Sequence, residues 1–98
     1  MKIIKRNGSE AAFDISKIIV AIGKANATVD ESIRMTPVQI QRIAESVVLS
    51  CEKLGRSPSV EEVQDMVEKQ AEMMLVQNLL EKLERYLMRT ILLGKWAN

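Results

Sequence analysis

The chain has 98 residues, enough for one domain with one hydrophobic core but too few for a large catalytic domain. Its 14 basic and 13 acidic side chains give a net charge of +1, so no general positive field draws the protein to nucleic acid or to an anionic membrane. It contains no histidine and only one each of Phe, Trp and Tyr, which disfavours imidazole catalysis, zinc sites and base-stacking nucleic-acid binders.

The single cysteine, Cys51, falls on the apolar side of a predicted helix, and we interpret it as a packing residue rather than a reactive thiol. One cysteine cannot form an internal disulfide, which suits a reducing compartment. The apolar runs are shorter than the roughly 18 residues that a membrane helix needs, and the N-terminus reads as a strand rather than a signal sequence. We therefore expect a soluble, cytoplasmic protein.

The chain opens with a predicted β-hairpin. Asn7-Gly8 lies between two short runs that can form strands, and this pair is typical of a two-residue type I′ turn. Such a turn pairs Lys5 with Glu10 and Ile4 with Ala11. The pattern therefore predicts an antiparallel hairpin over about residues 3–13.

A helix is predicted directly after the hairpin. Asp14 is suited to cap it, and isoleucines recur at one-turn spacing from Ile15 to Ile22, which indicates a core-facing stripe. Lys17 and Lys24 fall together on an adjacent stripe. Two ammonium groups are thus expected on one side of this helix.

Two further helices follow a polar connection over residues 26–35. Thr36, Pro37 and Gln39 form a helix-start pattern, and the apolar spacing predicts a helix over about 37–54 that ends before Gly55. Residues 59–62, Ser-Val-Glu-Glu, form a second capping box, which begins a third helix.

The segment after Met73 is strongly helical and rich in apolar residues. Asn78, with Glu81 three residues later, could cap a fourth helix after a break near residues 77–78; otherwise the third helix continues. Its exposed apolar surface is wider than one helix hairpin can cover, and a dimer would cover it. The residues of this surface are Leu75, Val76, Leu79, Leu80, Leu83, Leu87 and Ile91.

The hairpin and first helix resemble the opening of the ATP-cone family. The family pattern is K-R-[DN]-G, four residues, F-[DN], two residues, then K-I, and residues 5–8, 13–14 and 17–18 match it throughout. Residues 36–40 match weakly and residues 59–68 match the opening of the family's third helix. The resemblance covers residues 1–73, whereas residues 74–98 lack the family's glycine corner and tyrosine-rich motif. It implies an α+β fold in which an N-terminal hairpin packs on three to four helices, within one domain over residues 1–98.

The resemblance also implies a nucleotide site. ATP-cones are regulatory domains of ribonucleotide reductases and of a zinc-ribbon repressor, and they bind ATP or dATP without consuming it. Since the sequence has no glycine-rich phosphate loop, basic side chains and the hairpin backbone must hold the ligand, with or without Mg²⁺. Lys24 is added from its helical spacing, and the family's acidic ribose-contacting position is occupied here by Ala11, which leaves the choice between ATP and dATP open. The candidate residues are Ile4, Lys5, Arg6, Lys17, Lys24 and Gln64.

These observations favour a non-enzymatic allosteric sensor that acts with a reductase catalytic domain or subunit. The main alternative is a helical homodimerisation module with a vestigial nucleotide site. A DNA-binding repressor is disfavoured by the near-neutral charge and the lack of a cysteine cluster, and no nucleophile, base or metal cluster supports a hydrolase. Whether the sequence is a stand-alone chain or a fragment, and whether it takes one nucleotide or two, remains open.

Overall fold

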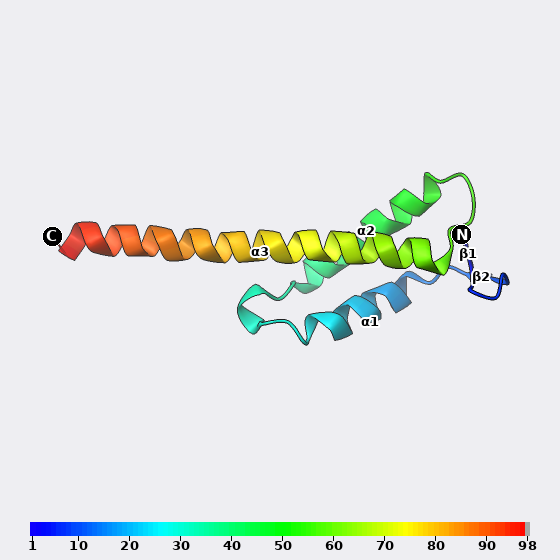
Figure 1. Ribbon diagram of the computed structural model, residues 1–98, viewed down its shortest axis with the longest axis horizontal. Coiled ribbons are helices and arrows are strands. Elements are labelled where there is room, and N and C mark those ends of the chain that lie inside the picture. Colours follow the sequence, from blue (N-terminus) through cyan, green and yellow to red (C-terminus); the bar gives the residue numbers. More distant parts are fainter. Residues whose placement is uncertain (98) are drawn as a thin grey trace.

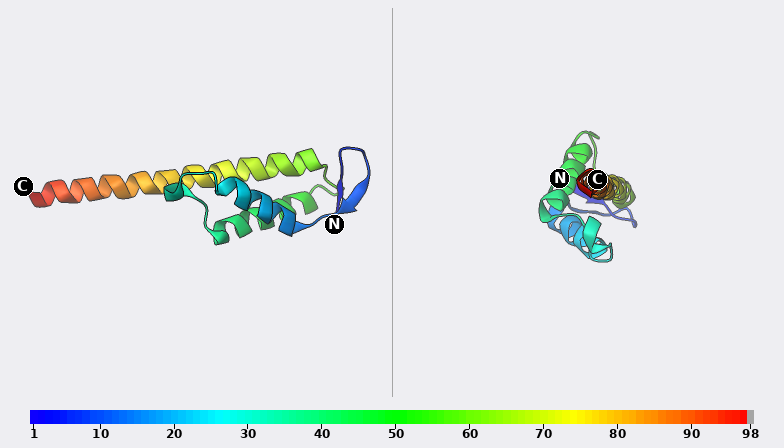
Figure 2. Two further views of the ribbon diagram at one scale, coloured as in Figure 1. Left: turned by 90° about the horizontal axis from the view of Figure 1, so that it is seen from below. Right: turned by 90° about the vertical axis from the view of Figure 1, so that its left-hand side faces the viewer.

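The computed structural model describes residues 1–97, and their side chains as far as residue 95 (Figure 1). A two-stranded hairpin lies at one end of three α-helices, which confirms the expected α+β fold. The longest helix projects well beyond the other two, so the molecule measures 68 × 25 × 18 Å (Figures 1 and 2). In chain order the elements are β1 (Lys2–Ile4), β2 (Glu10–Ala12), α1 (Ile15–Asn26), the 3₁₀ turn η1 (Glu31–Ile33), α2 (Pro37–Glu52) and α3 (Val60–Ala97).

The hairpin forms, but its predicted turn and register were wrong. The Gly8 N–H donates to the Lys5 carbonyl over 2.9 Å and the Lys5 N–H donates to the Ser9 carbonyl over 2.8 Å. Gly8 alone in the loop has a positive φ, of 84°. This pattern is a three-residue loop, a type I turn closed by a glycine bulge. Asn7 keeps a negative φ, and its side-chain oxygen accepts from the Ser9 N–H over 3.0 Å.

The extra loop residue shifts the strand pairing by one position. Ile3 pairs with Ala11, and Ile4, not Lys5, pairs with Glu10. Glu10 instead forms an ion pair with Lys2, at 3.6 Å. The slip changes which β2 residues share a face with Ile3 and Lys5, so that Ala11 takes the place expected for Ala12. On this face Ile3 packs against the core, and Lys5 lies on that same inner side.

The predicted helix starts are confirmed. Asp14 accepts from the Ser16 N–H over 3.0 Å, and Thr36 and Gln39 form a reciprocal capping box. Ser59 and Glu62 form another, with both bonds at 3.1 Å. Each cap satisfies backbone N–H groups that a helix leaves free at its first turn.

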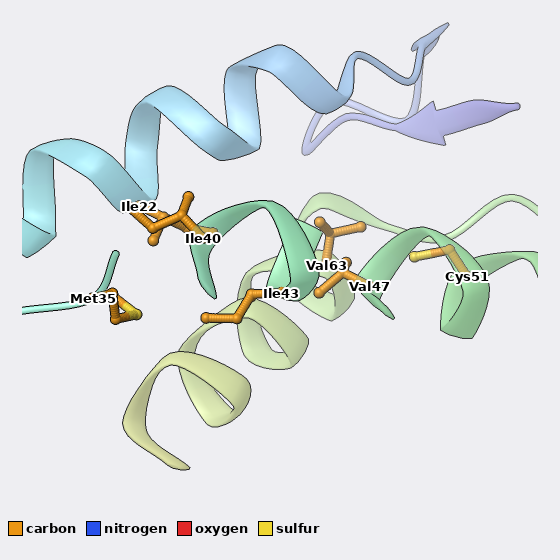
Figure 3. Close-up of a cluster of buried hydrophobic side chains, with 7 residues drawn as sticks. All are labelled: Ile22, Met35, Ile40, Ile43, Val47, Cys51 and Val63. Atoms are coloured by element: carbon orange, nitrogen blue, oxygen red, sulfur yellow. The ribbon is translucent and has the colours of Figure 1, made fainter. Parts of the chain in front are cut away.

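The core lies where α2 packs against both α1 and α3 (Figure 3). Val47 and Ala44 of α2 are fully buried, and Cys51 is almost so, which agrees with its interpretation as a packing residue. Burial raises the pKa of the Cys51 thiol above its ordinary value. Because α2 occupies the centre, α1 and α3 make little contact with each other. The buried cluster consists of Ile22, Met35, Ile40, Ile43, Val47, Cys51 and Val63.

Two buried asparagines fix the connection between α1 and α2. The Asn26 side chain donates to the Met35 carbonyl over 2.9 Å and accepts from the Met35 N–H over 2.8 Å. Asn78 of α3 donates to the Ile33 carbonyl over 3.1 Å and exchanges hydrogen bonds with Gln39. Residues 26–35, predicted as a simple polar connection, are thus held by hydrogen bonds from Asn26 of α1 and from Asn78 of α3.

The possible break at residues 77–78 is absent, and α3 runs without interruption from Val60 to Ala97. Asn78 does not cap a new helix, because its side chain forms the hydrogen bonds to Ile33 and to Gln39 of α2 just described. With neither glycine nor proline between Val60 and Leu93, nothing in this stretch stops the helix. Despite this length, no helix of the described residues is long and apolar enough to cross a membrane.

We predict that acid removes the ion pair between Arg56 and Glu62 at the start of α3. Arg56 donates two hydrogen bonds to Glu62, and together with the Ser59 N–H it lowers the pKa of Glu62 from 4.5 to about 2. A lowered pKa stabilises the fold above pH 4.5, and this stabilisation is lost as the pH falls towards 2. The difference in melting temperature between the parent and Glu62→Gln should therefore shrink over that range. A difference independent of pH would contradict the assignment.

We also predict that Asn78→Ala lowers the free energy of unfolding by about 1–3 kcal/mol, because it strips buried carbonyl groups of their donor. Urea titration followed by circular dichroism would measure this change. Gln77→Ala, at the neighbouring exposed position of the same helix, is the matched control and should change stability by less than about 0.5 kcal/mol. Equal effects of the two substitutions would show that the Asn78 hydrogen bonds contribute nothing to the free energy of unfolding.

Candidate functional site

The hairpin is attached to the N-terminal end of α3. The Ile4 N–H donates to the Pro58 carbonyl over 2.8 Å, and Ile4 forms a parallel bridge with Ser59. Pro58 is fully buried at this junction. The strands therefore lie across the ends where α1 and α3 both begin (Figures 1 and 2).

A small recess lies beneath the hairpin, with a volume of about 220 Å³. Lys5 borders it from the hairpin and Lys17 from the first turns of α1, so lysines from two different elements line it. Asp14 lines it as well. Hydrogen bonds from the Ser16 hydroxyl and N–H, with a contribution from Lys17, hold the pKa of Asp14 below its ordinary value. The recess is thus bordered by two basic residues and by one carboxylate that already accepts hydrogen bonds from Ser16.

The recess continues into a groove of about 520 Å³ between α1 and α3. The groove exists because α2 separates these two helices, and small side chains such as Ala21, Ala25 and Ala71 line it. Its walls are mostly apolar, with Lys17, Gln64 and Glu68 as its main polar side chains. Five residues line both the groove and the recess: Ile3, Lys17, Ile18, Val60 and Val63.

Three of the predicted site residues come together. Lys5 and Lys17 share the recess, and Lys17 and Gln64 share the groove. Lys17 therefore joins the cationic part of the site to the apolar part. This arrangement offers lysine side chains for an anion and, next to them, an apolar surface with one amide. The Gln64 Nε2 donates to the Glu68 carboxylate over 3.1 Å, so a ligand that binds this amide has to share or displace that bond.

The other three predicted residues are placed differently. Arg6 is exposed on the hairpin loop and its Nε lies 3.0 Å from Glu61 of α3. The backbone N–H of Ile4 is already bonded to Pro58. Lys24, seven residues beyond Lys17 and about 10 Å along α1, lines neither the recess nor the groove.

Several lining residues were not identified from the sequence. Ile3, Val60 and Val63 border both cavities, yet each reads as ordinary strand or helix packing. Their placement depends on the bridge between Ile4 and Ser59, which joins positions 55 residues apart, and no local pattern reports it.

The fold and site define a class of small α+β module, a hairpin set over a helical groove with basic side chains at its mouth. A family model described as the ATP cone domain matches residues 1–91 of the chain. The chain belongs to this family, whose domains are regulatory, nucleotide-binding and non-catalytic. The match includes the segment after residue 73, where the tyrosine-rich pattern is lacking. A comparison with curated proteins found no match.

Proposed function

We propose that this chain binds ATP or dATP without turnover and acts as the allosteric sensor of a ribonucleotide reductase, in the cytoplasm. The observation that carries the proposal is the meeting of Lys5, Lys17 and Gln64 around one continuous recess and groove. Family membership supplies the ligand class. The reductase partner, a catalytic domain or subunit, follows from the family alone.

The geometry suggests how the nucleotide would lie. The groove's volume of about 520 Å³ is within the usual range of ligand sites, and its apolar walls suit the faces of an adenine ring. The Gln64 amide would pair with the donor and acceptor groups on the base edge after exchanging its 3.1 Å hydrogen bond to Glu68 for the ligand. The phosphates would then point to Lys17 and Lys5, with Mg²⁺ bound through phosphate oxygens if it accompanies the ligand. Because the Ile4 N–H is occupied, we assign less of the base recognition to the hairpin backbone.

We predict that isothermal titration detects adenine-selective binding that Lys5→Ala/Lys17→Ala weakens at least tenfold, since both phosphate-facing charges are removed. ATP and dATP should bind with affinities within about threefold of each other, because Ala11 offers the ribose no hydrogen bond. GTP serves as the base-selectivity probe.

The matched control is Lys53→Ala/Lys69→Ala, which removes two lysines that line neither the recess nor the groove. It should leave the affinity unchanged. Equal losses in both double variants would mean that only overall charge matters, and a folded parent that binds neither ATP nor dATP would refute the proposed function.

We further predict that Glu61→Gln raises nucleotide affinity several-fold. Arg6 is held 3.0 Å from the Glu61 carboxylate, so an incoming phosphate competes with this ion pair for the guanidinium group. Removing the carboxylate charge frees Arg6. Titration of Glu61→Gln and of Arg6→Ala/Glu61→Gln measures the effect, and the gain should vanish in the second variant. A gain that persists without Arg6 would assign it to the general loss of negative charge.

The second candidate function, a helical self-association module, is favoured by one observation. Large apolar side chains of α3 beyond Asn78 are exposed, Leu80, Leu87 and Leu93 among them. This function is compatible with nucleotide binding, because the exposed half of α3 lies beyond the groove.

A further inference from the structure

A regular row of apolar side chains runs along the exposed part of α3. The spacing between successive members is alternately three and four residues, which is the heptad pattern of a coiled-coil seam. About half or more of each side chain is exposed, with exposed fractions of 64, 56, 54, 47 and 57% in chain order. We call this row the α3 seam: Met73, Val76, Leu80, Leu83 and Leu87.

Most of the seam points away from the rest of the molecule. Met74 and Asn78 face the helical core and the η1 segment, and each lies two residues from Val76. In an α-helix a two-residue offset places side chains on nearly opposite faces. Met73, at the start of the seam, borders a hollow that it shares with Arg42 of α2. From Val76 onward the body of the domain does not obstruct a partner that approaches the seam.

The seam is broadened on both sides by further exposed apolar residues. Leu79, Tyr86 and Leu93 follow one edge at seven-residue spacing, and Ile91 lies on the other edge. Four charged residues of the same stretch lie on the back of the helix, whereas Glu84 lies on the edge that Ile91 follows, seven residues before it. The four are Glu81, Lys82, Arg85 and Arg89. A surface of this kind is stable in water only when another apolar surface covers it.

We propose that a second copy of this chain covers the α3 seam, so that two α3 helices pair as a short coiled coil. A heptad seam is complementary to itself, because the apolar side chains of one helix fit between those of an identical helix. The seam spans about 21 Å from Met73 to Leu87. Burying it with its edges on both copies would remove on the order of 1,000 Å² from solvent, which is about the minimum expected of a biological interface.

The pairing does not depend on nucleotide binding. The groove reaches Leu75, next to the start of the seam in sequence, but its α3 residues lie on roughly the opposite side of the helix from Val76 and Leu80. Lys5 and Lys17 lie at the hairpin end of the domain. Both nucleotide sites would stay open in the dimer. Failure of one proposal therefore leaves the other standing.

Light scattering after size exclusion tests the pairing in the absence of nucleotide. The full chain should give the mass of a dimer at tens of micromolar, and Leu83→Lys/Leu87→Lys should give a folded monomer by circular dichroism. Arg85→Ala/Arg89→Ala, on the back of the same stretch, is the control and should remain dimeric. A parent that is monomeric at several hundred micromolar, or a dimer that survives the lysine substitutions, overturns the proposal.

Cysteine cross-linking locates the contact independently of mass. In a Cys51→Ala background, Val76→Cys and Leu87→Cys each place one thiol on the seam, at the two heptad positions that face each other in an antiparallel pair, and Arg85→Cys places one on the back. Disulfides within each seam variant indicate parallel helices, and disulfides only in the mixture of the two indicate antiparallel helices. Both results support pairing through the seam. Cross-linking no faster at the seam than at position 85 contradicts it.

Discussion

The geometry of the candidate site depends on one backbone hydrogen bond, from the Ile4 N–H to the Pro58 carbonyl. A two-stranded hairpin is only marginally stable alone, and here it is held on the helices by this bond and by the packing of Ile3 on the core. Together they place the hairpin so that Lys5 and Lys17 line the same recess.

The position of α2 has a comparable effect on the groove. Because α2 packs on both neighbours, α1 and α3 remain apart, and the space between them is bordered by small side chains. The packing of α2 in the core therefore also keeps the groove between α1 and α3 open. Substitutions in α2 that let α1 approach α3 would narrow the groove although they touch none of its polar residues.

The helix starts and the core could be predicted from the sequence, because caps and one-turn periodicity are local signals. Thr36 with Gln39 and Ser59 with Glu62 are examples in which chemistry and spacing agree. The hairpin register could not be predicted, since Asn7-Gly8 suits two turn types and the side chain of Asn7 decides between them by bonding to Ser9. Asn78 misled the prediction for a similar reason. An asparagine can cap a helix, but this side chain instead forms hydrogen bonds with Gln39 and Ile33, which lie 39 and 45 residues away in the sequence.

The candidate site shows the same division. Lys5, Lys17 and Gln64 were selected from the sequence and lie around one cavity system, whereas Lys24 was selected from helical spacing and lies outside it. Helical spacing places residues on one face but does not say how far along that face a ligand space extends. That limit is determined by the hairpin, a non-local element, and by the separation of the helices.

The continuity of α3 also has a mechanical consequence. A single helix of 38 residues is a stiff rod about 57 Å long, and its first turn borders the groove while its last turns stand clear of the body. A rod that is tilted by about 5° at one end moves its far end by about 5 Å. A small tilt of α3 near Val60 and Gln64 would thus produce a larger displacement of its C-terminal end, without any rearrangement of the helix in between.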